Sequence, residues 1–173
     1  ARFCRIQKTC RTMSASLPPD LGNWQQLSAL VVDDEPGMRN FIERALRERC
    51  GAVASAGSAE EGARLIEAQH FDLVILDIAL PGRNGVEWLA DLRAQGFTGD
   101  VILITAFSSI EMAIDALRAG ASDFILKPFR IDQLLTAIKR CVDRTLLARQ
   151  NFLLRREVAE ITGTEGIEGM VGV

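Results

Sequence analysis

The sequence contains no tyrosine and only one histidine, His70. A phenolic hydroxyl is therefore missing from any site of this chain, and no pair of imidazoles can bind a metal ion. His70 directly precedes the apolar stretch FDLVIL. We interpret it as a solvated turn residue rather than as a ligand or a phosphodonor.

The sequence also lacks cysteine motifs and apolar runs of membrane length. Its cysteines, Cys4, Cys10, Cys50 and Cys141, form no CxxC pair and no metal-like spacing, so we expect reduced thiols in an intracellular protein. No apolar run approaches the roughly 20 residues of a membrane helix, and the N-terminus has no apolar signal-peptide core. These absences predict a cytoplasmic protein with no membrane partner.

A strong imbalance of charge is missing too. The net charge is −3 at pH 7, with both signs scattered along the chain, which gives no general case for binding nucleic acid or a membrane surface. With 173 residues, of which 48% are hydrophobic, the chain is long enough for one well-filled core and short for two. Any binding function must therefore come from a local site.

Apolar runs alternate with helical patterns from residue 28 onward. The runs are ALVV (29–32), AVASA (52–56), LVIL (73–76), VILIT (101–105) and DFIL (123–126). Strand–helix alternation predicts a parallel sheet, and continuously apolar strands suit a sheet that is covered on both faces. The sequence therefore predicts an α/β domain built from successive βα units.

The helices between these runs have recognisable faces and ends. The helix that begins near Pro36 places several apolar residues on one face: Met38, Phe41, Ile42, Ala45 and Leu46. Ser58 and Glu61 have the spacing of a capping box at the start of the next helix. A later stripe ends at Gly120, a residue typical of a helix C-terminus. The members of this stripe are Ile110, Ala113, Ile114 and Leu117.

Both ends of the chain differ from this regular middle part. We predict a leader over residues 1–26, partly disordered or left over from cloning, because residues 1–12 are basic and SASLPPDLGN is rich in Pro, Gly and Ser. A cloning remnant or an upstream mis-start explains the basic residues better than a nucleic-acid arm. At the other end the last helix has no breaker before Gly163, so we expect it to continue as a linker over residues 144–162.

This last helix has two candidate seams for packing. The first contains Leu135, Ile138 and Val142. The second is out of heptad phase with it and contains Leu147, Leu154, Val158 and Ile161. The pattern therefore supports a coiled coil only in part. The alternatives are an amphipathic helix packed on its own chain and one packed on a domain missing from this sequence.

Polar residues end four of the five predicted strands. Asp33 and Asp34 follow the first strand and Asp77 the third, while Thr105 ends the fourth and Lys127 follows the fifth. In open α/β sheets the carboxyl ends of the strands meet at one edge, where ligands bind. We therefore expect three carboxylates, a hydroxyl and an ammonium group in one crevice.

The acidic residues at this edge require a compensating charge, because three neighbouring carboxylates repel and raise at least one pKa. A cluster with only oxygen ligands favours a hard ion such as Mg²⁺. A carboxylate nucleophile, a metal ion, a hydroxyl and an ammonium group can together bind a phosphoryl group and neutralise its oxygens. In the alternative interpretation, Asp33, Asp34 and Glu35 only favour the dipole of the helix that begins near Pro36.

Four motifs, VVDDEP, LVILDIALPGRNG, VILITA and DFILKPF, occur in this order on the predicted strands. Together they resemble the receiver domain of two-component response regulators, over residues 27–143. The resemblance implies a flavodoxin-like, doubly wound sheet of five parallel strands in the order 2-1-3-4-5, with the extended C-terminal helix as a linker.

The resemblance also implies a role for each acidic residue. Asp77 would be the phosphoacceptor and would take its phosphoryl group from a phosphohistidine of a sensor histidine kinase. Mg²⁺ would be bound by Asp34, Asp77 and the backbone carbonyl of Ala79, with Asp33 acting through metal-bound water.

The remaining site residues follow from the same resemblance. Thr105 would donate a hydrogen bond to a phosphoryl oxygen, and Lys127 would pair with the phosphoryl group. Phe124 stands where the family has an aromatic switch residue, commonly Tyr, so Thr105 and Phe124 would form a switch without its hydroxyl-dependent part. Lys127–Pro128 matches the family's cis peptide bond.

Two other function classes fit parts of this pattern. Haloacid-dehalogenase-like phosphatases also use an Asp nucleophile, a Thr or Ser, a Lys and Mg²⁺. These enzymes share a second Asp, two residues after the nucleophile, which serves as the general acid. Here that position is Ala79, so turnover lacks its proton donor. A pseudo-receiver used only for dimerisation is disfavoured by the intact site. We therefore expect a phosphoacceptor rather than an enzyme with a separate substrate.

The C-terminal sequence GTEGIEGMVGV resembles the entry into the ATPase domain of nitrogen-regulator-type, sigma-54-dependent transcriptional activators. Residues 163–173 would then begin an output domain, and DNA and sigma-54 RNA polymerase would be contacted only through missing domains. We predict a homodimer through the fourth and fifth helices and the linker, because a second copy can cover the apolar stripe of the linker. Phosphorylation is expected to rearrange this dimer.

Overall fold

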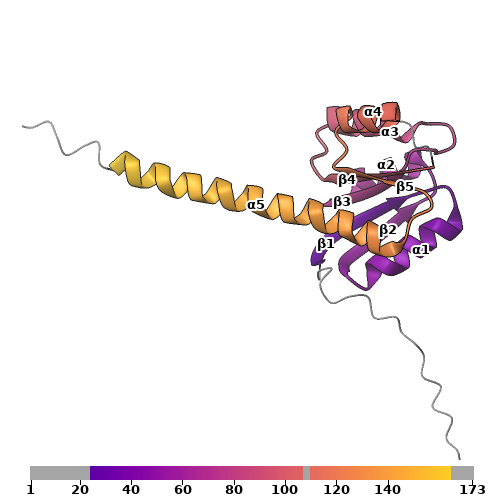
Figure 1. The fold of residues 1–173 in the computed structure, drawn as a ribbon, viewed down its shortest axis with the longest axis horizontal. Coiled ribbons are helices and arrows are strands. Elements are labelled where there is room, and N and C mark those ends of the chain that lie inside the picture. The colour runs from indigo at the N-terminus through magenta and orange to yellow at the C-terminus, as the bar shows by residue number, and fades with distance from the viewer. Residues whose placement is uncertain (1–23, 107–109, 165–173) are drawn as a thin grey trace, which may run out of the picture.

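Strands and helices alternate along the chain, as the sequence pattern predicts (Figure 1). The computed structural model describes residues 24–106 and 110–164, without the side chains of residues 110, 112, 113 and 157–164. Residues 1–23 of the predicted leader and residues 165–173 of the predicted start of an output domain (163–173) lie outside this part. The strands are β1 (Trp24–Val32), β2 (Cys50–Ala56), β3 (Leu73–Asp77), β4 (Asp100–Thr105) and β5 (Asp123–Leu126). The helices are α1 (Pro36–Arg47), α2 (Ala59–Ala68), α3 (Gly85–Ala94), α4 (Ile110–Arg118) and α5 (Ile131–Thr164).

The strands form one parallel sheet in the order β2-β1-β3-β4-β5. This confirms the predicted flavodoxin-like, doubly wound topology. The order reverses direction at β1, so β1 and β3 lie side by side in the middle of the sheet. Such a reversal opens a crevice at the carboxyl ends of these two strands, because the connections leave toward opposite faces.

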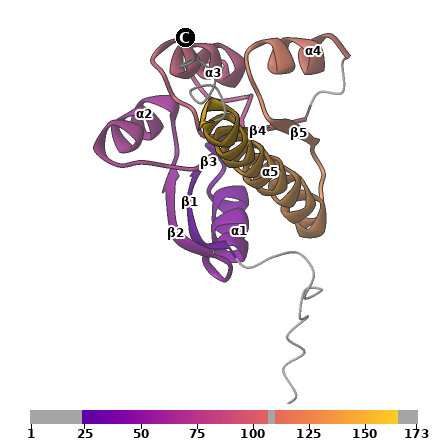
Figure 2. The same ribbon diagram turned by 90° about the vertical axis from the view of Figure 1, so that its left-hand side faces the viewer.

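Helices cover both faces of the sheet, and Figure 2 shows them around it with α5 seen nearly end-on. Successive residues of β1 point to opposite faces, with Val31 in one buried cluster and Leu30 in the other. The first cluster packs the sheet against α1 and α5, and the second packs it against α2, α3 and α4. Since both faces are buried, the strands read as continuous apolar runs rather than as alternating ones.

Strand β1 begins at Trp24, five residues before the apolar run that predicts it. Trp24 is buried and pairs with Cys50 of β2, and the register then shifts before Ser28. Between them Gln25 and Gln26 are polar and exposed and only Leu27 is apolar, so no apolar run marks this part of the strand in the sequence. The predicted domain boundary at residue 27 therefore falls inside β1.

Two predicted apolar faces are only partly directed at the core. Helix α1 packs through Ile42 and Leu46, whereas Phe41 is 47% exposed. In α4 the small residue Ala116 is buried, while Ile114 and Leu117 of the predicted stripe are exposed. A small residue lets the helix approach the sheet closely, so the larger residues beside it remain at the surface.

The predicted helix ends agree better with the structure. Helix α4 ends at Arg118, and Gly120 has a φ of +95°, a left-handed conformation that favours glycine. The Ser58 hydroxyl caps α2 by accepting a hydrogen bond from the Glu61 amide. The Glu61 carboxylate accepts from the Gly57 amide rather than from that of Ser58, so the capping box is displaced by one residue.

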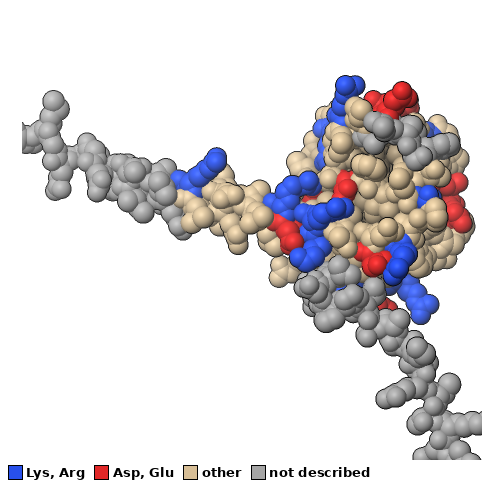
Figure 3. Space-filling model, in the orientation of Figure 1, with Lys and Arg blue, Asp and Glu red and all other residues tan. Residues whose placement is uncertain are grey.

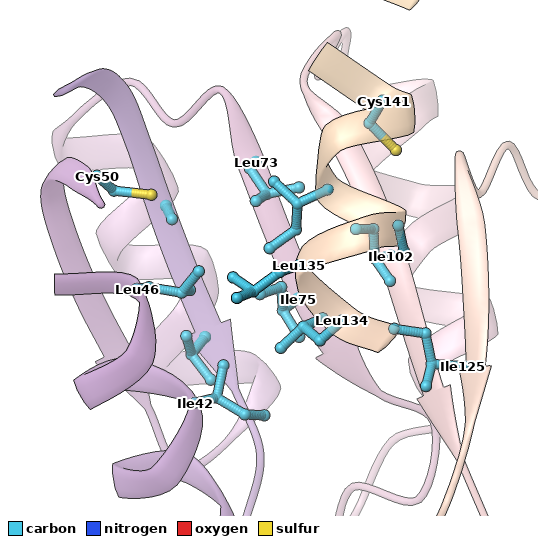
Figure 4. Close-up of a cluster of buried hydrophobic side chains, with 14 of the residues drawn as sticks. Ile42, Leu46, Cys50, Leu73, Ile75, Ile102, Ile125, Leu134, Leu135 and Cys141 are labelled. Atoms are coloured by element: carbon cyan, nitrogen blue, oxygen red, sulfur yellow. The ribbon is translucent and has the colours of Figure 1, made fainter. Parts of the chain in front are cut away.

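Helix α5 continues well past the sheet, as predicted, and projects from the body of the domain (Figure 1). Its first part is buried on the sheet through Leu135, labelled in Figure 4, and through Ile138. Val142 packs beside them, so the first predicted seam belongs to the core of this domain. Leu147 and Leu154 of the second seam are exposed, and the side chains of Val158 and Ile161 lie outside the described part.

The exposed part of α5 is basic. Residues 144–156 include four arginines and no acidic residue, and Figure 3 shows Lys and Arg side chains gathered where the helix leaves the domain. No helix in the part of the chain that the structure describes combines the length and the apolar character needed to cross a membrane.

Polar contacts hold α5 against the starts of β4 and β5. The Asp100 carboxylate accepts hydrogen bonds from the Ser122 hydroxyl at 2.6 Å, from Arg144 at 3.1 Å and from the Thr145 hydroxyl at 3.2 Å. We call this group of four residues the Asp100 junction. The Arg140 guanidinium adds an ion pair with Asp123 at 2.7 Å. The helix is therefore fixed to the sheet at the end opposite to the carboxyl ends of the strands.

Candidate functional site

The carboxyl edge of the sheet gathers the predicted acidic residues. Asp33 and Asp77 are 1% and 4% exposed, whereas Asp34 is exposed beside them. One carboxylate oxygen from each of Asp33, Asp34 and Asp77 lies within 4.8 Å of the others. Three oxygen ligands at this spacing fit a hard divalent cation such as Mg²⁺. The expected meeting of these residues at one edge is therefore confirmed.

Lys127 supplies the positive charge next to this cluster. Its ammonium nitrogen lies 2.6 Å from Asp77 Oδ2 and 3.2 Å from Asp33 Oδ2. Burial alone would lower the pKa of Lys127, but the contacts with Asp77 and then Asp33 outweigh it and raise the pKa. The lysine is thus held in its charged form between two buried carboxylates.

Asp33 is fixed where β1 turns into α1. Its backbone amide donates to the Ala56 carbonyl at 3.2 Å, and its Oδ1 accepts from the Glu35 amide at 2.8 Å. Burial raises the pKa of Asp33, and the hydrogen bonds from Glu35 and Lys127 offset this only in part. A solvated charge at a helix N-terminus would not be buried against a lysine, so the helix-dipole interpretation does not account for Asp33.

Asp77 is the last residue of β3, and the loop after it is tightly folded. Its Oδ1 accepts from the Ala79 amide at 3.1 Å, which holds the Ala79 backbone beside the carboxylate. The Gly85 amide donates to the Ile78 carbonyl, and a Cβ at Gly85 would lie 2.5 Å from the Asp77 carbonyl oxygen. Gly85 is therefore required for this close approach, although the sequence motif gave no reason to single it out.

The predicted switch residues lie on the neighbouring strands. Thr105 is buried at the end of β4, and its carbonyl accepts from the Lys127 amide at 2.7 Å, which joins the ends of β4 and β5. Phe124 of β5 is half-buried and packs against the cluster on the α2–α4 face. The Lys127–Pro128 peptide bond is cis, the form expected at this position.

Two further groups outside the crevice have simple structural explanations. His70 is exposed and lies 3.3 Å from Asp72, in agreement with the prediction of a solvated turn residue. Cys50 and Cys141 are buried and free, and Cys4 and Cys10 lie outside the described residues. His70, Cys50 and Cys141 therefore contribute no group to the site.

The geometry has counterparts in known proteins. Residues 29–139 match the family model described as the response regulator receiver domain. Since this match covers well over half of the chain, the chain belongs to the response regulator receiver domain family. It is a receiver domain of two-component response regulators, with the fold and the acidic edge described above.

Curated relatives with similar sequences are longer proteins. The chain is 40% identical over 125 residues to the alginate biosynthesis transcriptional regulatory protein AlgB of Pseudomonas aeruginosa, covering 72% of this chain and 28% of AlgB. It is 31% identical over 138 residues to the two-component response regulator PhoP of the same species, covering 80% of this chain and 56% of PhoP. The chain therefore spans between about a quarter and about half of these relatives.

Solved structures show the same fold. NtrX from Brucella abortus, solved in complex with ATP, is similar with a TM-score of 0.67 and 33% identity, over 74% of this chain and 29% of that one. The receiver domain of the Francisella response regulator 1452 has a TM-score of 0.65 and 30% identity, over 69% of this chain and 99% of that one.

Proposed function

We propose that this receiver domain accepts a phosphoryl group on Asp77 from a phosphohistidine of a sensor histidine kinase. The observation that carries this proposal is the ion pair of the buried Asp77 carboxylate with Lys127, inside a cluster of three carboxylates. A carboxylate held in this way is positioned to attack phosphorus, and Lys127 is positioned to neutralise a phosphoryl oxygen.

In the proposed reaction a bond forms between an Asp77 oxygen and phosphorus while the bond from phosphorus to the histidine nitrogen breaks. Asp34, Asp77 and the Ala79 carbonyl would bind Mg²⁺ directly, and Asp33 would bind it through water. When bound, Mg²⁺ supplies the positive charge that offsets the added phosphoryl oxygens. Lys127 can then exchange its Asp77 partner for the phosphoryl group and keep its contact with Asp33.

Thr105 and Phe124 are the proposed response elements. A phosphoryl group adds about 1.5 to 2 negative charges, which attract the Thr105 hydroxyl toward the site. The space that Thr105 leaves can be entered by Phe124, which is half-buried on the adjacent strand. Because packed interiors allow few intermediate arrangements, this movement would select between two discrete packings of the α4–β5–α5 surface.

The proposed reaction is tested by intact-mass measurement after incubation with acetyl phosphate and Mg²⁺. The wild-type chain should gain one phosphoryl group, and Asp77→Asn should gain none. Removing Mg²⁺ with EDTA should prevent labelling of the wild-type chain. Labelling of Asp77→Asn to the wild-type level would show that another residue is the acceptor. No turnover of a separate substrate is expected, because the methyl side chain of Ala79 cannot act as a general acid.

We further propose that the natural output is transcriptional and of the sigma-54-dependent type. Support comes from the longer relatives, since AlgB is named a transcriptional regulatory protein and NtrX crystallised with ATP. DNA and sigma-54 RNA polymerase would then be bound only by domains beyond this chain. Sequencing the native gene beyond the codon for Val173 tests this subtype, which requires an ATPase domain with a Walker A motif at that place.

A homodimer through α4, α5 and the linker is the proposed assembly. Exposed apolar residues support it on α4 and along the linker: Ile114, Leu117, Leu147 and Leu154. The arginines of residues 144–156 oppose it, because two such helices side by side repel. A dimer that uses the linker should therefore strengthen as salt screens the repulsion. Light scattering at low and high salt, with and without beryllofluoride and on a chain ending at Asp143, tests both the interface and its response.

A further inference from the structure

Arg39 reaches from α1 to the turn that carries the acidic residues. Its Nη1 donates a hydrogen bond to the backbone carbonyl of Asp33 at 2.6 Å, and the side chain is half-buried. The Asp33 amide, Oδ1 and Oδ2 are already bound by Ala56, Glu35 and Lys127. Arg39 therefore fixes the remaining polar group of the residue at which β1 ends, in the peptide unit that leads to Asp34.

Gly57 makes room for this guanidinium. It lies in the turn between β2 and α2, and a Cβ built on it would be 3.2 Å from Arg39 Nη1. The Gly57 amide donates to Glu61 Oε2 at 2.8 Å, so this turn has little freedom to move away. The arginine thus sits between the backbone of one turn and the carbonyl of another, and a Cβ at position 57 would press on the guanidinium and require it to move by a few tenths of an ångström.

We propose that Arg39 is a positioning residue that holds Asp33 and Asp34 in the geometry required for Mg²⁺. The inference depends on the proposed metal site. Mg²⁺ requires near-ideal octahedral geometry, so a small shift of the turn changes the distances to both carboxylates. Groups that orient metal ligands without touching the metal typically change its affinity by about 10- to 100-fold when they are removed.

The charge of Arg39 acts in the opposite direction. A guanidinium close to the site repels a divalent cation, so loss of the charge alone would tighten metal binding. Positioning by the hydrogen bond predicts the reverse, that Arg39→Ala binds the metal more weakly. Arg39→Gln separates these effects because it removes the charge and keeps an N–H donor.

The experiment measures the affinity for Mn²⁺, a probe for Mg²⁺, from the EPR signal of the free ion. Arg39→Ala should bind Mn²⁺ about tenfold more weakly than the wild-type chain, and Arg39→Gln should recover most of this loss. Arg44→Ala is the matched control, because Arg44 is exposed on the same helix. It should leave the affinity unchanged apart from a small charge effect.

Gly57→Ala strains the same contact while Arg39 stays in place. It should weaken Mn²⁺ binding less than Arg39→Ala does, and the two losses should not add in the double variant, because both changes act on one contact. Thermal unfolding in EDTA shows whether Arg39→Ala is still folded. If it is not, the Mn²⁺ affinities of Gly57→Ala and Arg39→Gln decide the outcome. Tighter or unchanged binding by the folded Arg39→Ala chain would overturn the inference. A wild-type chain that binds no Mn²⁺ would instead overturn the metal site itself.

Discussion

Lys127 and Asp77 form an ion pair between the ends of β5 and β3, with 2.6 Å between Nζ and Oδ2. The Lys127 side chain is 18% exposed and that of Asp77 is 5% exposed, so solvent screens this pair far less than a surface pair. The ammonium group lies directly against the carboxylate that we propose as the phosphoacceptor. The metal-free state is therefore stabilised by the residue that we propose pairs with the phosphoryl group.

Replacing Lys127 with alanine should destabilise the metal-free protein. Two buried carboxylates lose their cation, which should lower the free energy of unfolding by about 1 to 3 kcal/mol in EDTA. Mg²⁺ should then stabilise Lys127→Ala more than it stabilises the wild-type chain. Urea unfolding in EDTA and in Mg²⁺ measures both effects. Lys139→Ala, which breaks the surface pair with Asp143, is the control and should cost less than about 1 kcal/mol.

Replacing Gly85 with alanine should damage the site through the backbone. The new Cβ would meet the Asp77 carbonyl at 2.5 Å and the Ile78 Cα at 2.9 Å, so the loop must shift. We expect a loss of about 1 to 3 kcal/mol in unfolding free energy and reduced labelling of Asp77 by acetyl phosphate. In Gly37→Ala the nearest atom lies 3.9 Å from the new Cβ, in the first turn of α1. That control should keep full stability, and equal effects of the two changes would contradict the steric argument.

Replacing Asp100 with alanine should release the linker helix from the sheet. The Asp100 junction loses its acceptor for Ser122, Arg144 and Thr145 at once. Hydrogen exchange should become faster at the amides of residues 144–150, while amides of β1 and β3 remain protected. Asp91 lies on α3 and forms an exposed ion pair with Arg83, so Asp91→Ala should leave hydrogen exchange in the linker unchanged. Unaltered exchange in the Asp100 variant would mean that the helix does not depend on this junction.

The buried thiols should make the protein less stable in alkaline solution. Burial raises the pKa of both Cys50 and Cys141 from 9.0 to about 11. The folded chain therefore keeps two protons that the unfolded chain releases, so their stabilisation is complete below pH 9 and is lost as the pH rises toward 11. The raised pKa of each thiol contributes about 2 to 3 kcal/mol to the free energy of unfolding below pH 9. Urea unfolding at pH 8 and pH 10.5 should show a smaller loss in Cys50→Ala and Cys141→Ala than in the wild-type chain.

Much of the fold was predictable because its determinants are local in the sequence. Short apolar runs followed by helical spacing specified five βα units, and the strand-end rule then brought Asp33, Asp77 and Lys127 together without any further information. The glycine after α4 marked a helix end for the same local reason, since its backbone has a positive φ.

The features that could not be predicted depend on contacts between distant parts of the chain. The start of β1 is fixed by the pairing of Trp24 with Cys50, and the polar residues after Trp24 conceal it. The exposure of Leu117 follows from how closely α4 approaches the sheet, which periodicity cannot specify. Arg39 likewise looks like any other charged residue of an amphipathic helix until Asp33 and Gly57 are placed around it.

Because α5 is long, its orientation at the Asp100 junction decides where its far end lies. From Thr145 to Thr164 the helix runs for about 30 Å, at roughly 1.5 Å per residue. If the helix stays straight and tilts by about 10° at the Asp100 junction, its far end moves by about 5 Å. Strand β4 begins at Asp100 in this junction and ends at Thr105. Strand β5 begins beside it and leads to Lys127. A displacement at the carboxyl edge of the sheet that tilted this junction by about 10° would thus move the tip of the linker by about 5 Å.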